Sequence, residues 1–122
     1  MQSGYKKIDS NTISFGVAPR INACGRMGYQ EEALDLFLTN NIEEARKITA
    51  RLNSYNLERQ TKEKDIFEQA IKELEKEDIE KLNTIVLSGD NWHHGVIGIV
   101  ASKLTEKFYK PTILILSLIH IW

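Results

Sequence analysis

The middle of the chain carries one long helical pattern. No glycine or proline occurs between Asn41 and Gly89, and two apolar stripes at helical spacing flank an all-polar stretch at residues 58–65. We therefore predict a helix from Ile42 toward Glu77 that packs at both ends and crosses solvent between them. The alternative is a pair of helices with a break at residues 53–56. A coiled coil is disfavoured because its repeat would be short and interrupted.

The segment before that helix has a weaker pattern. Residues 1–30 are rich in turn-forming side chains, and the loose alternation at residues 12–17 predicts a short strand. A short helix is predicted from Gln30, with apolar residues through Leu38, and Asn40-Asn41 ends the segment. Glu31 and Glu32 lie in its first turn, where the positive end of the helix dipole favours acidic side chains.

The segment after the long helix reads as a βαβ unit. A linker at residues 77–83 precedes an apolar, β-branched stretch, and a second such stretch follows Pro111. Strands joined by a helical crossover are parallel. The fold class is therefore α/β: a long interdomain helix, then a βαβ unit of a mixed or parallel sheet. Its predicted parts are a strand at 84–88, a loop at 89–95, a helix at 96–109 and a strand at 112–116.

Length and composition limit the classes of protein to consider. The chain has 122 residues, 42% of them hydrophobic and 27% charged, which fits one modest globular domain or parts of two. The net charge of −1 excludes a global basic field, although basic residues outnumber acidic ones in residues 1–30 and 84–122. The single cysteine, Cys24, fits a reducing compartment, so we expect a cytoplasmic location and a small buried thiol. The longest apolar run is about half of what a membrane-spanning helix needs, so no membrane association is expected.

The first candidate site is the segment Pro19-Arg20-Ile21-Asn22-Ala23-Cys24-Gly25-Arg26-Met27. We predict a loop whose small residues let a ligand approach. Arg20 and Arg26 flank it, and an arginine fork suits a phosphate. Asn22 would hold the loop or donate to a phosphoryl oxygen. The alternative is that both arginines are ion-paired surface residues.

The second candidate site lies between the predicted strand at 84–88 and the helix that follows it. Open α/β sheets bind ligands at such positions, where the first turn of a helix favours anions. We predict that the backbone N–H groups of Gly95 and Val96 hold a phosphate, with Gly95 and Gly98 giving room. Trp92 would stack on a base and His93 would donate to a phosphate, unless Trp92 is a packing residue.

No metal site is predicted at His93-His94. Adjacent side chains diverge on a strand or a helix, and no cluster of metal-ligating residue types lies nearby at a suitable spacing. The segment is also neither a Walker loop nor a dinucleotide-binding glycine motif.

Three segments resemble the RecJ exonucleases of the DHH phosphoesterase superfamily. They are Phe15-Gly16-Val17-Ala18-Pro19-Arg20-Ile21-Asn22-Ala23-Cys24-Gly25-Arg26-Met27, Asn53-x-x-Asn56-x-x-Arg59, and Trp92-His93-His94-Gly95-Val96-Ile97-Gly98-Ile99-Val100-Ala101-Ser102. Tyr109-Lys110-Pro111-Thr112 adds to the match, which covers roughly residues 10–116. In the family pattern His94 falls at a variable position, so His93 is the favoured histidine.

The resemblance implies a function for the parent protein. RecJ-like enzymes degrade single-stranded DNA from 5′ to 3′ in DNA repair and recombination, using Mn²⁺ or Mg²⁺ held by Asp and His side chains. Those ligands lie in motifs upstream of Phe15. The resemblance therefore implies that this chain holds no catalytic residue and no metal ligand, and that it is inactive alone.

The resemblance also implies a domain organisation. Residues 1–41 would be the C-terminal tail of the DHH catalytic domain, residues 42–83 a connecting helix and linker, and residues 84–122 the truncated start of the DHH-associated nucleic-acid-binding domain. Residues 117–122 depart from the family pattern.

Single-stranded DNA is the expected partner, and the truncated sheet predicts self-association through the apolar strand at 112–116. Two alternatives stay open. One is another DHH-superfamily phosphoesterase, an oligoribonuclease or a nucleotide phosphatase. The other is a non-enzymatic helical interaction module.

Overall fold

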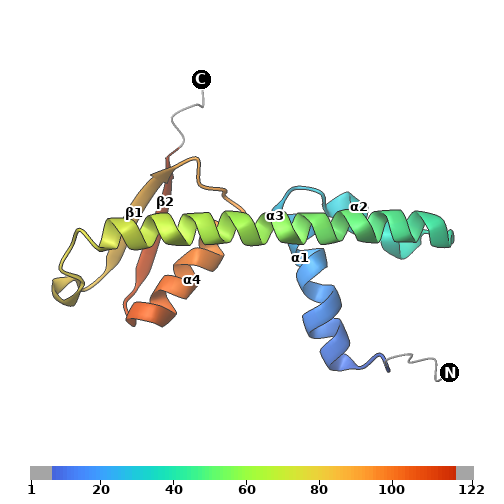
Figure 1. Cartoon of the computed structure of the whole chain (residues 1–122), viewed down its shortest axis with the longest axis horizontal. Helices are drawn as coiled ribbons and strands as arrows, with labels where there is room; N and C mark the ends of the chain where they lie inside the picture. The colour runs from blue at the N-terminus through green and yellow to red at the C-terminus, as the bar shows by residue number, and fades with distance from the viewer. Residues whose placement is uncertain (1–6, 118–122) are drawn as a thin grey trace. The chain divides into compact units, whose positions relative to one another are not determined.

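The chain forms two compact units that meet within one helix (Figure 1). The computed structural model describes residues 7–117. Helix α3 (Ile42–Leu74) contributes its first part to the N-terminal unit, which extends through Leu57, and its second part to the C-terminal unit, which begins at Glu58. The helix has no break at residues 53–56, so the alternative of two helices is wrong. Within residues 7–117 no helix combines the length and apolar character that crossing a membrane requires.

The N-terminal unit is helical from its first described turns. A π-helical segment (Thr12–Val17) leads into α1 (Ala18–Arg26), and α2 (Gln30–Leu38) follows. The core is a cluster of small and branched side chains contributed by all three α-helices. Its buried members are Cys24, Ala33, Ile48 and Leu52. The predicted helix at 30–38 and the predicted buried stripe on the first part of α3 are thus confirmed.

Two predictions about the first thirty residues are wrong. The stretch 12–17 is a π-helix, because the carboxylate of Asp9 accepts hydrogen bonds from the backbone N–H of Thr12 (2.8 Å) and from its hydroxyl (2.9 Å). Such side-chain capping starts a helix rather than a strand. The predicted loop at residues 19–27 is α1, where Pro19 occupies the first turn and breaks no hydrogen bond.

Gly28 follows the end of α1, at a position where the backbone is left-handed. Gly28 has φ +88°, and its N–H donates to the carbonyl of Gly25 (3.2 Å). The next N–H, that of Tyr29, donates to the carbonyl of Cys24 (2.9 Å). This pair of bonds is a Schellman motif, which satisfies the last carbonyls of the helix and turns the chain toward α2.

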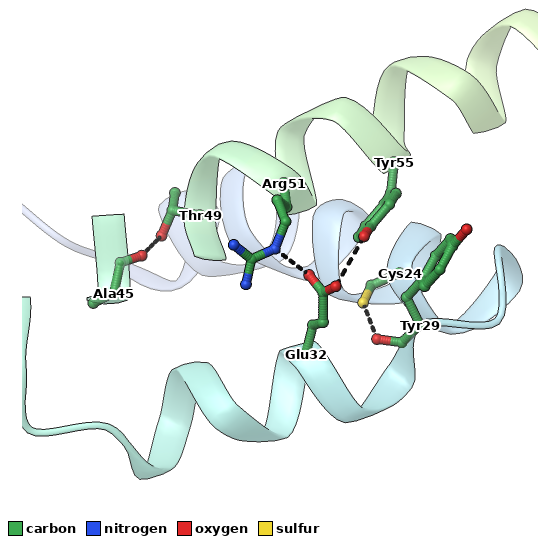
Figure 2. Close-up of polar contacts among 7 residues, drawn as sticks. All are labelled: Cys24, Tyr29, Glu32, Ala45, Thr49, Arg51 and Tyr55. Carbon is green, nitrogen blue, oxygen red and sulfur yellow. Dashed lines mark hydrogen bonds and ion pairs between the residues drawn. The ribbon is translucent and has the colours of Figure 1, made fainter. Parts of the chain in front are cut away.

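A polar network joins α2 to the first part of α3 (Figure 2). The carboxylate of Glu32 accepts hydrogen bonds from Arg51 Nε (2.8 Å) and from the Tyr55 hydroxyl (2.9 Å). The Tyr29 ring stacks on the Tyr55 ring with 4.3 Å between centroids. Beneath it, the Cys24 thiol donates to the Tyr29 carbonyl (2.7 Å). The hydrogen bond from Arg51 lowers the pKa of Glu32, because it stabilises the ionised carboxylate.

The C-terminal unit is a βαβ unit, as predicted. Strand β1 (Ile85–Asp90) pairs in parallel with β2 (Thr112–Ser117), in a register that sets Ile85 opposite Thr112. Helix α4 (Ile97–Phe108) joins the strands and packs against β2 (Figure 1). A short 3₁₀ turn (Ile79–Lys81) lies within the predicted linker. The predicted α/β class is confirmed.

The core of this unit is apolar. Buried side chains come from the second part of α3, from β1, from the β1–α4 turn and from α4, and they are Ile66, Ala70, Leu74, Ile85, Trp92, Val96, Val100 and Leu104. Helix α4 ends at Phe108, and the residue that follows it, Tyr109, has the left-handed φ of +53°.

The sheet carries an exposed apolar face. Val86 on β1 and its register partner Ile113 on β2 are both more than half exposed, and Ile115 is about half exposed. Their side chains alternate with inward-facing ones along each strand. Self-association through this part of the sheet remains a prediction.

The polar stretch at residues 58–65 does not simply cross solvent. Glu63 is only 5% exposed, and its carboxylate forms ion pairs with Arg59 one turn earlier and with Lys103 on α4. A carboxylate that is taken out of water needs such partners. The pattern of charged residues could not predict this burial, because the partner Lys103 lies on another helix and reaches Glu63 only in the folded unit.

Gly89 lies where the C-terminal unit has no room for a larger side chain. A Cβ atom built at Gly89 would lie 2.0 Å from Cε2 of Trp92, whereas one at Gly98 meets nothing within 4 Å among the described residues. We expect Gly89→Ala to lower the free energy of unfolding by about 1–3 kcal/mol, because the indole must move. Gly98→Ala, inside α4, should raise it by about 0.5–1 kcal/mol. Urea unfolding followed by tryptophan fluorescence measures both, and equal effects would contradict the assignment.

The Glu32 network predicts a pH dependence. Because the folded pKa of Glu32 lies below the ordinary value of 4.5, its contribution to stability is complete above that pH and is lost as the pH falls through the lower folded value. The difference in unfolding free energy between the wild type and Glu32→Gln should therefore shrink on acidification. Glu31→Gln, on the exposed neighbour, is the control. A difference that is constant from pH 7 to acid would contradict the role of Glu32.

Candidate nucleic-acid interface

The residues predicted to bind nucleic acid fall into two groups, one in each unit. Arg20, Asn22 and Arg26 lie on α1 of the N-terminal unit. Trp92, His93, Gly95 and Val96 lie between β1 and α4 of the C-terminal unit.

Helix geometry divides the α1 group. Arg20 is turned toward α3, where its Nε donates to the Asn53 side-chain oxygen and its Nη1 donates to the Gly16 carbonyl. Asn22 and Arg26 are exposed and four residues apart, so they share one helix face. Arg20 lies about 200° around the helix from Asn22 at the helical angle of ~100° per residue. The predicted pair of arginines flanking one loop is therefore not formed.

Trp92 is buried rather than displayed. It is 4% exposed, it packs against Gly89, and its indole N–H donates to the Gln69 side-chain oxygen on α3 (2.9 Å). A buried indole with its one donor satisfied fits the alternative of a packing residue. A stacking role for Trp92 remains a prediction without an exposed ring face to support it.

His93 organises the start of α4. Its Nδ1 accepts the N–H of Gly95 (3.0 Å), and its carbonyl accepts the N–H groups of Val96 (3.0 Å) and Ile97 (3.1 Å). These are the amides predicted to hold a phosphate, and in this structure they are bonded within the turn. A phosphate would have to replace His93 as their acceptor. The imidazole thus holds the Gly95 amide in the turn before α4, while the backbone carbonyl of His93 accepts the amides at the start of the helix.

The histidine pair does not diverge as predicted. The rings of His93 and His94 stack with 4.9 Å between centroids and 15° between planes, because both residues belong to a turn rather than to a regular element. Burial, followed by the charges of His94 and Lys62, lowers the pKa of His93 below its usual 6.5. His93 is thus neutral at pH 7, with Nδ1 as acceptor and the proton on Nε2.

The turn faces a small cavity of about 140 Å³. It lies between the turn and one side of α3. Its walls are formed by Lys62, Asp65, Ile66, Gln69, Asn91, Trp92 and His93. Sequence reasoning missed the contribution of α3. Lys62 is the residue that could have indicated this contribution, because it is a cation within the stretch 58–65 that was predicted to lie in solvent.

The chain resembles known exonucleases over most of its length. No protein-family model matches it. It is 35% identical over 109 residues to the single-stranded-DNA-specific exonuclease RecJ of Bacillus subtilis, covering 89% of this chain and 14% of the relative. The RecJ of Thermus thermophilus is 37% identical over 103 residues, covering 84% and 15% respectively. The chain spans less than a fifth of the length of these curated relatives.

Solved structures agree with the sequence comparison. The crystal structure of Thermus thermophilus RecJ in complex with Mg²⁺ matches with a TM-score of 0.77 at 35% identity, covering 86% of this chain and 16% of that one. A structure of exonuclease RecJ bound to manganese matches with a TM-score of 0.80 at 38% identity, covering 93% and 28%.

Fold and sequence together show that most of the chain is homologous to part of the single-stranded-DNA-specific exonucleases. The homologous family is RecJ, as the three motifs predicted.

The described part of this chain has no group of side chains that could hold the metal ions of those structures. Within residues 7–117 no three His, Cys, Asp or Glu side chains gather as a metal site would require. The two stacked imidazoles of His93 and His94 are too few donors, and Nδ1 of His93 is already bonded to the Gly95 amide. We therefore derive no chemical step through a metal held by these residues.

The environment of His93 predicts its titration. In an NMR pH titration, the His93 imidazole should titrate with a midpoint below 6.5, because burial disfavours the imidazolium. His94→Gln should move the midpoint upward but leave it below 6.5, since burial is the larger cause. The folded state loses stability as the pH falls below 6.5 and through the lower folded pKa, because protonated Nδ1 no longer accepts the Gly95 N–H. A wild-type midpoint at or above 6.5 would refute this environment.

Proposed function

We propose that this chain is part of a RecJ-like exonuclease that degrades single-stranded DNA from 5′ to 3′ in DNA repair and recombination in the cytoplasm. The observation that carries the proposal is the 35% identity to a RecJ over 109 residues, together with the matching RecJ structures. The metal ions of catalysis, Mn²⁺ or Mg²⁺, would be held by parts of the enzyme other than residues 7–117.

The contribution of this chain would be to hold the DNA strand. On α1, Asn22 and Arg26 present an amide and a guanidinium side by side on an exposed face, which suits contact with phosphate oxygens. In the C-terminal unit, Lys62 and the neutral His93 line the cavity beside the turn and supply further donors. Arg20, bonded to Asn53, would position α1 against α3 rather than contact DNA through a free fork.

We propose the same domain assignment that the motifs imply. Residues 1–41 would close the catalytic domain, residues 42–83 would connect the domains, and residues 84–122 would begin the DHH-associated domain. The compact units divide instead at Leu57, because α3 shares its packing between the elements before it and those after it.

The salt dependence of DNA binding tests whether Arg26 contacts a phosphate. Each phosphate that a protein contacts on a single strand contributes about −0.7 to the slope of log affinity against log salt concentration. We expect Arg26→Gln to weaken binding of a fluorescent oligo(dT) and to reduce the slope by about 0.7. Fluorescence anisotropy of the 122-residue chain at several salt concentrations measures both.

The matched control is Arg46→Gln, which removes another exposed arginine, one that lies on α3 and not on α1. It should leave the slope unchanged. A duplex of the same length should bind more weakly than oligo(dT). Equal losses in the two arginine variants, or equal binding of duplex and single strand, would contradict the proposed role.

A further inference from the structure

The C-terminal unit holds a second and larger cavity of about 470 Å³, where α3 lies beside α4. Its volume is within the range of pockets that bind small molecules, about 300–1,000 Å³. Its walls are formed by Arg59, Gln60, Glu63, Lys64, Phe67 and Lys103. None of these side chains belongs to the turn around His93 or to α1.

The charges around this cavity favour an anion. Three cations, Arg59, Lys64 and Lys103, line it against one carboxylate, that of Glu63. The side chains of Lys64 and Lys103 are 75% and 53% exposed, so an incoming ligand can reach both. The positive excess stands out because acidic residues outnumber basic ones in the surrounding segment 31–83.

Glu63 fixes two of the cations in place. Its two carboxylate oxygens pair separately with Arg59, one helical turn earlier, and with Lys103 on α4. The ammonium group of Lys103 has three N–H donors, more than one carboxylate oxygen uses. Holding the two cations before the ligand arrives reduces the side-chain entropy that binding would otherwise cost.

Phe67 distinguishes the ligand from a simple anion. It is partly exposed at the cavity wall, one turn after Glu63 on the same helix. Proteins that bind single strands combine cations for the backbone with aromatic rings for the bases. Gln60 adds an amide that can donate to phosphate or base.

We infer that this cavity is a binding site for one nucleotide of a single strand, with the phosphate at Lys64 and Lys103 and the base against Phe67. Glu63 is a positioning residue for Arg59 and Lys103. The inference rests on the proposed function for the identity of the ligand as DNA, and it adds a site that the sequence motifs did not indicate.

The experiment compares two charge-matched double variants of the 122-residue chain. Lys64→Gln/Lys103→Gln removes two cavity cations, and Lys72→Gln/Lys107→Gln removes two lysines of the same helices outside the cavity. Oligo(dT) binding is measured by anisotropy at several salt concentrations. The cavity variant should reduce the salt slope by about 0.7, so that the affinity lost between about 50 and 200 mM salt shrinks about 2.6-fold. The control should keep the wild-type slope.

Two further variants separate binding from folding. Lys64→Gln alone leaves both Glu63 ion pairs in place and removes only the exposed pair of Lys64 with Glu68 (3.9 Å). Because exposed ion pairs contribute little to stability, it should reduce the slope with almost no change in the unfolding midpoint. Phe67→Leu should weaken binding about fivefold or more while the slope stays the same, because it removes stacking but no charge. Equal slopes in the cavity and control double variants, or no effect of Phe67→Leu, would overturn the inference.

Thymidine monophosphate separates this inference from the proposed function. It should shift the NMR amide signals of Lys64, Phe67 and Lys103, and oligo(dT) should shift the same signals at lower concentration. If the wild type binds no oligo(dT), the proposed function fails, yet shifts with the mononucleotide would still uphold a nucleotide site. If oligo(dT) binds and Arg26→Gln acts as expected while these three signals do not move, the cavity site is wrong and the proposed function stands.

Discussion

The packing of Trp92 against Gly89 sets the geometry on which the C-terminal unit depends. The indole occupies the space where any other residue at 89 would place its Cβ atom, and its N–H is bonded to Gln69 on α3. One side chain thus ties the end of β1 to the second part of the long helix. In the turn that follows, the imidazole of His93 accepts the Gly95 N–H and the His93 carbonyl accepts the N–H groups of Val96 and Ile97. A residue type that usually suggests base stacking here acts as an anchor.

Each unit also uses one carboxylate to fasten a neighbouring helix to α3. In the N-terminal unit, Glu32 on α2 accepts hydrogen bonds from Arg51 and Tyr55 of α3. In the C-terminal unit, Glu63 on α3 pairs with Lys103 of α4. Apolar packing alone is not directional, whereas these bonds fix which face of each helix meets its neighbour. In the second case the same pairing places two cations at the edge of a cavity.

Periodicity predicted the regular elements well because their patterns are local. The 3.6-residue stripe identified α2, α3 and α4, and apolar β-branched runs around a helical segment identified two parallel strands. The failures lie where a few specific bonds decide the backbone. Asp9 caps the helical segment that was predicted to be a strand. The segment that was predicted to be a loop is helical because Pro19 lies in the first turn of α1, where it breaks no hydrogen bond, and a Schellman motif at Gly28 ends that helix. For the candidate site, the sequence identified the segments but not how their side chains lie. Arg20 and Asn22 point to different sides of α1, and Arg20 is bonded to Asn53. The Gly95 amide, predicted to hold a phosphate, is bonded to His93.

The sequence by itself determined the α/β class, the extent of the long helix and the homology to RecJ, because hydropathy period and motif spacing are written along the chain. Only the tertiary structure decided which charged residues are buried and which are displayed. Glu63 and Lys103 are 40 positions apart in sequence and meet because α4 folds back beside α3. Burial and ion pairing depend on such long-range neighbours, so a run of charged residues gives no sign of which member leaves the solvent.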